Sequence, residues 1–258
     1  MIFLICGEYK TGKTVSACTF PKPLLLLDYD NGFLSVPITK DRTGKLVVPD
    51  HSEIIRVQFY KSEVQELNFK TDMGKGGGVA PKYTSVSMEM HKKYNTIVKE
   101  LYEKKAYQEK KIRTLVIDSL TTMFRLWKEA ILSVNNIPAL RIADYGSLEG
   151  ILYGQFIPTL RTLVEEKIVD NIVLITHIDM EKDDILGSII EFPVGPSRNM
   201  GRNMGLYFDE IYRQKQEGDK YVWRTKKTGF FQAGSRLNVT DGIEAHYKSL
   251  APILDGIK

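Results

Sequence analysis

The segment from Gly7 to Thr14 constrains the fold of this chain more than any other. It reads Gly-Glu-Tyr-Lys-Thr-Gly-Lys-Thr, so two glycines bracket four free positions and are followed by Lys-Thr. This is the P-loop pattern, in which backbone N–H groups at a helix N-terminus cradle phosphate oxygens. The apolar run over residues 1–6 predicts a strand before the loop, and residues 14–19 can begin a helix after it. Strand, loop and helix in this order predict a nucleotide-phosphate site.

The loop predicts ATP and Mg²⁺ as ligands. Lys13 would reach the β and γ phosphates, and the Thr14 hydroxyl would ligate the magnesium ion. A chance match to the pattern is the alternative, but such a match is rare directly after an apolar strand. We expect the nucleotide to contact the loop along its whole length, at Gly7, Glu8, Tyr9, Lys10, Thr11, Gly12, Lys13, Thr14 and Val15.

The composition is that of an ordinary globular protein and excludes several other classes. The chain has 258 residues, 43 % hydrophobic and 26 % charged, which fits a single domain over residues 1–258. Cys6, Cys18 and four scattered histidines form no metal-binding framework, which indicates a reducing cytosol and no structural zinc site. No signal peptide or membrane span is recognisable, so we expect a cytoplasmic protein. The net charge of +4 permits a polyanionic partner without requiring one.

Strands and helices are predicted to alternate along most of the chain. Apolar runs at 24–27, 54–59, 114–119 and 171–176 predict further buried strands, and helical spacing is found over 87–111, 120–131 and 148–163, the last with a kink at Pro158. This pattern predicts an α/β fold with a mostly parallel sheet covered by helices on both faces. Residues 179–196 are expected to form a long loop, and a flexible insertion is expected around 71–87. A β-rich end at 206–240, with antiparallel strands at 208–213, 221–226 and 230–236, would extend one edge.

Two acidic residues lie where predicted parallel strands end. Asp118 ends an apolar strand and could hold the magnesium shell opposite Thr14, although capping of the next helix would also explain it. We expect one strand to lie between this strand and the P-loop strand. Asp30 follows the second strand at the same sheet edge and is the candidate general base for the attacking water. Turn formation by Asp-Asn-Gly is the alternative explanation.

These landmarks together resemble the RecA-like P-loop ATPases, and most closely the small phage single-strand-annealing ATP-binding proteins, which consist of little more than that AAA-type core. The resemblance extends over the whole chain. Its sharpest parts are the P-loop, Leu-Leu-Leu-Leu-Asp-Tyr-Asp-Asn-Gly at 24–32, Leu-Val-Ile-Asp-Ser at 115–119, Asp-Tyr-Gly at 144–146, Ile-Thr-His at 175–177, and Arg236.

The resemblance implies roles for several residues. In the family, the turn after the second strand carries a catalytic glutamate, so Asp30 would take this role with a shorter side chain. His177 falls at the position of a γ-phosphate sensor, with an ordinary loop histidine as the alternative. ATP would lie between subunits of a homo-oligomer, where Arg236 of a neighbour would act as an arginine finger, with an exposed residue at the end of a strand as the alternative. Phosphates of single-stranded DNA would be contacted by Arg198, Arg202, Lys226 and Lys227, unless the two arginines belong to a solvated helix start.

The function implied is ATP binding and hydrolysis coupled to single-stranded DNA in phage-type recombination or annealing, in the host or bacterial cytoplasm. A single-strand-binding or replication protein is a further expected partner, and no membrane is expected. The alternative is a nucleotide-gated regulator or loader of a replication partner that hydrolyses little. Other P-loop classes fit less well. Partitioning ATPases carry a lysine where this chain has Glu8, and AAA+ motors end in a helical lid where this chain is expected to form antiparallel strands. Nucleoside-phosphate kinases have an Arg-rich lid between helices, whereas the candidate arginines here lie in a loop and in the terminal strands.

Overall fold

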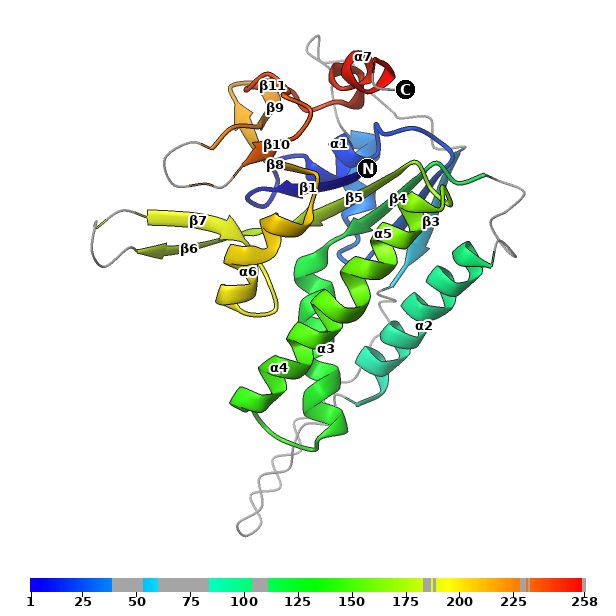
Figure 1. Cartoon of the computed structure of the whole chain (residues 1–258), viewed down its shortest axis with the longest axis vertical. Coiled ribbons are helices and arrows are strands. Elements are labelled where there is room, and N and C mark those ends of the chain that lie inside the picture. Colours follow the sequence, from blue (N-terminus) through cyan, green and yellow to red (C-terminus); the bar gives the residue numbers. More distant parts are fainter. Residues whose placement is uncertain are drawn as a thin grey trace.

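A mixed β-sheet flanked by helices forms the centre of the protein (Figure 1). The computed structural model describes residues 1–38, 53–59, 84–103, 111–182, 187, 189–227, 231 and 233–256. Within these residues the main sheet has nine strands, in the order β11-β9-β8-β1-β5-β4-β2-β3, with β10 paired to β8. The strands are β1 (Ile2–Cys6), β2 (Leu24–Asp28), β3 (Ile54–Gln58), β4 (Thr114–Asp118), β5 (Asn171–Thr176), β8 (Glu210–Glu217), β9 (Lys220–Arg224), β10 (Gly234–Ser235) and β11 (Ile243–Glu244).

The α/β prediction is confirmed, including the strand expected between the P-loop strand and the Asp118 strand. Strands β3, β2, β4, β5, β1 and β8 are all parallel, and β5 separates β1 from β4. The antiparallel extension at the C-terminal side is also confirmed, because β9 pairs antiparallel with β8 and with β11. The carboxyl ends of β1, β5, β4 and β2 therefore meet at one edge, where ligands of open α/β sheets bind.

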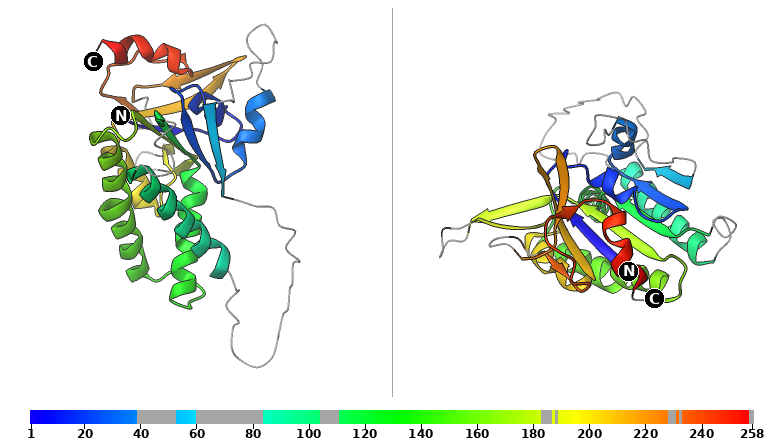
Figure 2. Two further views of the ribbon diagram at one scale, coloured as in Figure 1. Left: turned by 90° about the vertical axis from the view of Figure 1, so that its right-hand side faces the viewer. Right: turned by 90° about the horizontal axis from the view of Figure 1, so that it is seen from above.

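Helices cover both faces of this sheet (Figure 2). Because side chains alternate along a strand, Leu4 and Cys6 pack on one face while Phe3 and Ile5 pack on the other. The first face is covered by α2 (Thr84–Tyr102), α3 (Leu120–Val134), α4 (Ile142–Ile151), the π-helical segment η4 (Leu152–Phe156), α5 (Ile157–Glu165) and α6 (Arg198–Met204). The second face is covered by α1 (Lys13–Ala17), η1 (Gly32–Ile38), η6 (Tyr247–Ser249) and α7 (Ala251–Asp255), and η5 (Gly205–Tyr207) leads from α6 into β8.

The prediction of a long loop over residues 179–196 is wrong. An antiparallel hairpin occupies this region, formed by β6 (Ile178–Lys182) and β7 (Ile189–Pro193) as a separate two-stranded sheet. All five residues of β6 are exposed or half-buried, so the strand carries no apolar run that marks it in the sequence. Acidic residues, Gly187 and Pro193 favoured the loop interpretation instead.

Three further boundaries differ from the predictions. The strand expected at 208–213 is β8, which begins at Glu210 and is parallel to β1, because the hairpin and α6 return the chain to the amino edge of the sheet. Of the strand expected at 230–236, the structure describes residues 231 and 233–236, in which β10 spans Gly234–Ser235. The irregularity in the helix over 148–163 is the π-helical segment η4, whereas Pro158 lies in the first turn of α5, where proline needs no hydrogen-bond donor.

Two predictions fall wholly or partly outside the described residues. The flexible insertion around 71–87 lies there up to residue 83, and α2 has begun at Thr84. The end of the helix expected over 87–111 also lies there, from residue 104 to residue 110. Among the helices that the structure describes, none is both long enough and apolar enough to cross a membrane.

Candidate functional site

The P-loop turns directly from β1 into α1, and its two glycines are required by close contacts. Gly12 has φ +78°, and a Cβ there would lie 3.2 Å from the ring of Tyr221 on β9. A Cβ at Gly7 would lie 2.7 Å from the backbone oxygen of Gln214 on β8. The loop is therefore pressed against β8 and β9, and a larger residue at either glycine would displace it.

Lys13 is buried beneath the loop, with 7 % of its surface exposed. Its ammonium group donates to the backbone oxygens of Gly7, at 3.0 Å, and of Glu8. Burial lowers the pKa of Lys13, while the carboxylates of Asp118 and Asp30 partly offset this effect. Lys13 is thus the only cation buried in the described P-loop, and its ammonium group lies near two loop carbonyls and two carboxylates. From this position it can contact the oxygens of a bound phosphate.

Thr14 and Asp118 come together at the carboxyl edge of the sheet. The Thr14 hydroxyl donates to Asp118 Oδ2 at 2.5 Å, although 104 residues separate the two in sequence. A Cβ at Gly32 would lie 2.8 Å from both of these oxygens, so the glycine leaves room for them. One carboxylate and one hydroxyl suit Mg²⁺, which completes its shell with water and substrate phosphates. The donor set therefore fits the predicted magnesium site with one carboxylate and one hydroxyl, and the described residues contain no group of three or more His, Cys, Asp or Glu side chains that could hold a metal ion.

Asp118 is almost completely buried, and its surroundings strongly affect its ionisation. Burial raises its pKa to about 7, and the nearby carboxylates of Asp30 and Asp28 add to the rise. The Thr14 hydrogen bond and the Lys13 charge act in the opposite direction. Ionisation of a buried carboxyl group is unfavourable, and a divalent cation beside the group stabilises its charged form. The raised pKa of Asp118 is therefore consistent with a role as a metal ligand.

Asp30 lies next to Asp118 on the turn that follows β2. Its Oδ2 accepts a hydrogen bond from the Ser119 hydroxyl at 2.5 Å, and its side chain is exposed to solvent. A hydrogen bond from Arg56 Nε to the buried carboxylate of Asp28, at 2.8 Å, stabilises the start of this turn. Asn31 Oδ1 also accepts from Arg56, at 3.2 Å. The structure thus places the predicted general base at the same edge as the P-loop and Asp118.

His177 follows β5 directly and lies beside the start of the P-loop. Its backbone N–H donates to Thr121 Oγ1 at 3.0 Å, and Gly7 N donates to the carbonyl of Thr176 at 3.3 Å. Burial lowers the pKa of His177, with a further decrease from Lys13, while Asp30 and a hydrogen bond with the Gly7 backbone raise it. His177 therefore lies close enough to Lys13 and Asp30 to interact with their charges, and its role as a γ-phosphate sensor stays a prediction.

Gln214 is a functional candidate that the sequence did not reveal. This buried residue of β8 donates to the Thr11 carbonyl at 2.6 Å and accepts from Ser16 Oγ at 2.6 Å and from Trp223 Nε1 at 3.0 Å. The amide of Gln214 thus connects the P-loop and α1 to strands β8 and β9 of the sheet. Gln214 lies just beyond the strand predicted at 208–213 and belongs to no sequence motif, so only the tertiary contacts identify it.

Replacing Gln214 with leucine is expected to weaken ATP binding by about tenfold and to lower the melting temperature. The loop loses its donor at Thr11, and the buried Trp223 N–H loses its acceptor, which costs about 1–3 kcal/mol. Titration of ATP and a thermal melt would measure both effects. Gln216→Leu, at an exposed position of the same strand, is the matched control, and equal behaviour of the two variants would contradict the assignment.

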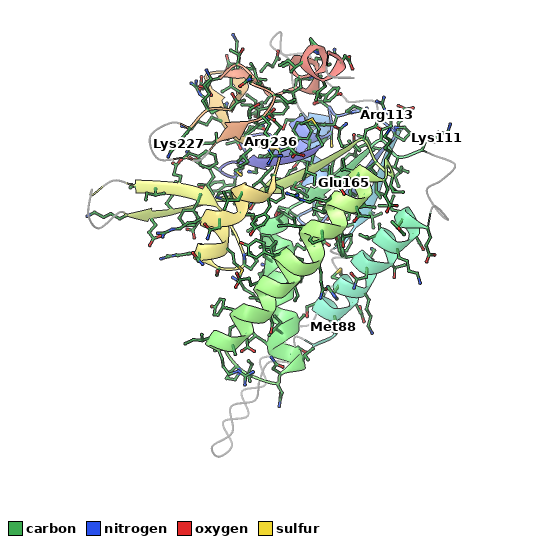
Figure 3. The ribbon with its side chains drawn as sticks, in the orientation of Figure 1. Met88, Lys111, Arg113, Glu165, Lys227 and Arg236 are labelled. Atoms are coloured by element: carbon green, nitrogen blue, oxygen red, sulfur yellow. The ribbon has the colours of Figure 1, made fainter. Side chains whose placement is uncertain are left out.

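The arginines predicted to bind DNA are paired with acidic residues of the hairpin. Arg198 lies 3.8 Å from Asp179, and Arg202 forms an ion pair with Glu181 while its guanidinium lies 5.6 Å from the centre of the Phe192 ring. Both arginines stay partly exposed, but hairpin carboxylates already neutralise them. Lys226 and Lys227 follow β9 and are exposed, and Figure 3 labels Lys227 at the end of that strand.

Arg236 lies far from the P-loop of its own chain. It follows β10, whose Ser235 pairs with Glu210 at the start of β8, and Glu210 aligns with Phe3 near the amino end of β1 (Figure 3). The Arg236 guanidinium donates to Asp209 at 2.9 Å and is 65 % exposed. It therefore lies at the sheet edge opposite to Lys13 and could meet a γ-phosphate only in another subunit.

Comparison with known proteins adds a family to this geometry. A family model described as an AAA domain matches residues 1–237. The match includes the P-loop, the Asp30 turn, Asp118, His177 and Arg236. No curated protein matches the chain.

Proposed function

Because the chain belongs to the AAA domain family, we propose that it binds ATP at the Gly7–Thr14 loop and hydrolyses it with Mg²⁺. The observation that carries the proposal is the contact between Thr14 and Asp118, formed next to the buried ammonium group of Lys13. ATP hydrolysis needs a cation that contacts the phosphates, oxygen ligands that hold the metal, and a carboxylate near the attacking water. Residues from the P-loop, β4 and the β2 turn supply these three elements at one edge of the sheet.

The proposed mechanism consists of positioning and charge stabilisation. Magnesium, when bound, would neutralise charge on the β and γ phosphates. Lys13 would exchange its contacts with the Gly7 and Glu8 carbonyls for phosphate oxygens, while Thr14 and Asp118 would hold the metal. Asp30, held by Ser119, would orient the attacking water and accept its proton, and His177 would contact the γ-phosphate.

Replacement of Asp30 with asparagine is expected to spare ATP binding and to lower the hydrolysis rate by about 100-fold, because an amide cannot accept the proton. Steady-state phosphate release together with ATP titration would separate the two effects. Asp219→Asn, on the exposed turn between β8 and β9, should leave both quantities unchanged. Unchanged turnover in the Asp30 variant would remove this residue from the mechanism.

We further propose that hydrolysis is coupled to single-stranded DNA through the β6–β7 hairpin, as in phage-type recombination or annealing. The hairpin starts immediately after His177, and Val194 N donates back to the His177 carbonyl at 2.9 Å. A change at the γ-phosphate sensor would therefore reach the hairpin and α6 directly. Arg198 and Arg202 would have to leave Asp179 and Glu181 in order to contact DNA phosphates, while Lys226 and Lys227 are already exposed.

The second candidate function is a nucleotide-gated regulator or loader of a replication partner that hydrolyses little ATP. The specific observation in its favour is Asp30, whose side chain is shorter than that of glutamate and already accepts a hydrogen bond from the Ser119 hydroxyl. ATP hydrolysis measured with and without single-stranded DNA, at two salt concentrations, distinguishes the two functions. DNA-stimulated turnover and DNA affinity that falls steeply with salt support the first function. Slow, DNA-independent turnover and no DNA binding at low salt support the second.

A further inference from the structure

Side chains of strand β3 hold the turn over residues 29–33, which carries Asp30. β3 pairs in parallel with β2, and its last residue, Gln58, is aligned with Asp28, the last residue of β2. The turn begins directly after Asp28, so side chains near the end of β3 lie beside it. Arg56 and Gln58 both form hydrogen bonds to the turn.

Arg56 contacts the turn at several points. Its guanidinium group donates to Asp28 Oδ2 at 2.8 Å and to Asn31 Oδ1 at 3.2 Å. Asp28 is fully buried, and its other carboxylate oxygen accepts from the backbone N–H of Gly32 at 3.0 Å. The guanidinium group also lies 5.4 Å from the centre of the Phe33 ring. One planar cation thus connects the start, the middle and the end of the turn.

Gln58 holds the middle of the turn together with Arg56. Its side-chain amide donates to Asn31 Oδ1 at 2.6 Å. Because a guanidinium group only donates hydrogen bonds, the oxygen of the Asn31 amide must face Arg56, and Gln58 donates to this same atom. Asn31 has φ +57°, a left-handed conformation that asparagine adopts more readily than most residues. The two hydrogen bonds therefore stabilise the residue that gives the turn its shape.

Asp30 lies between two residues that the β3 side holds in place. On one side, the buried ring of Tyr29 stacks on that of Phe59 with centroids 4.1 Å apart. On the other side is Asn31. The Asp30 side chain itself is exposed, so it is not fixed by packing in the core. Its direction depends on the backbone of its two neighbours and on the hydrogen bond from Ser119.

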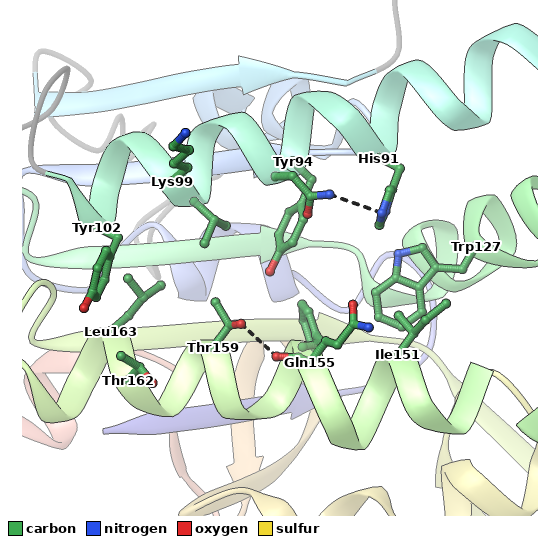
Figure 4. Close-up of a pocket in the computed structure, with 13 residues that line it drawn as sticks. His91, Tyr94, Lys99, Tyr102, Trp127, Ile151, Gln155, Thr159, Thr162 and Leu163 are labelled. Atoms are coloured by element: carbon green, nitrogen blue, oxygen red, sulfur yellow. Dashed lines mark hydrogen bonds between the residues drawn. The ribbon is translucent and has the colours of Figure 1, made fainter. Parts of the chain in front are cut away.

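Helix α2 holds the end of β3 in turn. Figure 4 shows this helix packed opposite the η4–α5 segment. Lys93 of α2 donates to the backbone carbonyl of Gln58 at 2.7 Å, and its ammonium group lies 5.1 Å from the centre of the Phe59 ring. A substitution of the Gln58 side chain leaves this backbone acceptor in place, so the contact of Gln58 with the turn can be removed separately.

We propose that Asn31, Arg56 and Gln58 are positioning residues for ATP hydrolysis, which hold Asp30 where its carboxylate can accept a proton from the attacking water. This inference rests on the proposed function, because the three residues act through Asp30. A general base must lie within hydrogen-bond reach of the proton that it removes, and a small displacement slows the reaction. ATP binding relies on the P-loop, so loss of these contacts should lower kcat and leave the KM for ATP unchanged.

The main test is Asn31→Gly. Glycine readily adopts the left-handed conformation, so this variant keeps the backbone and removes the bonds to Arg56 and Gln58. We expect kcat to fall about tenfold at unchanged KM. Asn136→Gly is the matched control, since Asn136 has φ +49°, is exposed and lies just after α3. Arg56 is kept, because its removal would leave Asp28 as an unpaired buried charge.

Gln58→Leu is the second variant and removes one of the two bonds, so kcat should fall about threefold. Gln216→Leu, at an exposed position of β8, is its control. Both test substitutions are also made in Asp30→Asn and followed by single-turnover phosphate release. Residues that act through Asp30 have no further effect once its carboxylate is gone, whereas a general structural role would reduce the rate equally in both backgrounds.

Unchanged kcat in Asn31→Gly and Gln58→Leu, with Asp30→Asn slowed about 100-fold, would overturn the inference and leave the proposed function intact. An equal loss of rate with and without the Asp30 carboxylate would overturn it as well. Normal hydrolysis by Asp30→Asn, or no hydrolysis by the wild type, would contradict the proposed function and the inference together. If circular dichroism shows that Asn31→Gly does not fold, Gln58→Leu decides alone.

Discussion

Lys13→Ala is expected to lose measurable ATP binding at micromolar nucleotide concentrations and, with it, all hydrolysis. The ammonium group is the only cation buried beneath the described P-loop, and it already lies within hydrogen-bond distance of two loop carbonyls. Two charge-assisted hydrogen bonds to phosphate are worth about 3–5 kcal/mol together, which corresponds to affinity weaker by about 10²–10⁴-fold. Fluorescence titration with a labelled ATP analogue, alongside phosphate-release assays, measures both losses.

Lys92→Ala is the matched control, since Lys92 is exposed on α2 and lies outside the site. Both proteins should show the same far-ultraviolet circular dichroism, so that loss of binding is not loss of fold. ATP affinity in Lys13→Ala equal to that of the control would contradict the P-loop assignment.

The same variant also tests whether subunits share the site. Arg236 is exposed at the sheet edge opposite to its own Lys13, so it could stabilise transition-state charge only in a neighbour. Lys13→Ala and Arg236→Ala, each inactive alone, should then recover part of the activity when mixed, because some interfaces combine an intact loop with an intact arginine. No recovery, in a mixture shown to associate, would leave Arg236 with only its structural contact to Asp209.

The second large effect is expected for Asp118→Asn, which should lower Mg²⁺-dependent hydrolysis by about 10²–10³-fold while stabilising the metal-free protein. Hydrolysis falls because the amide is a weaker metal ligand and supplies no negative charge. Stability rises at neutral and higher pH because wild-type Asp118 must there ionise in a buried position beside Asp30 and Asp28.

The direction of the predicted stability change follows from the raised pKa of Asp118. The folded-state pKa of Asp118 is raised to about 7 from the usual value of 3.8, so the folded state binds this proton more tightly than the unfolded state does. The stabilising contribution of Asp118 is therefore complete below about pH 4 and is lost as the pH rises through about 7. Denaturant melts in metal-free buffer between pH 5 and 8 should show this decline in the wild type and less of it in Asp118→Asn.

Magnesium should reverse the order of stability of the two proteins. With Mg²⁺ and ATP present at pH 8, the wild type gains binding free energy that the variant lacks. A wild type that Mg²⁺ and ATP do not stabilise, or an Asp118→Asn protein that hydrolyses ATP normally, would contradict the metal assignment.

The features that the sequence alone determined are contained in short contiguous segments. The P-loop is specified by eight neighbouring residues, and each parallel strand from β1 to β5 except β3 is buried along its whole length, so it is visible as an apolar run. Side chains that follow such strands meet at one sheet edge, which is why Asp30, Asp118 and His177 could be placed together. The prediction needed only burial patterns and the geometry of parallel strands.

Tertiary structure decided every feature that depends on which distant side chains meet. The hairpin strands are half-exposed and charged, so their pairing, and the ion pairs that Arg198 and Arg202 make with them, leave no periodic signal. Gln214 contacts Ser16 across 198 residues of sequence. Hydrophobic periodicity encodes which face of an element is buried, but a polar contact depends on the distance and angle between two elements, which no local pattern encodes.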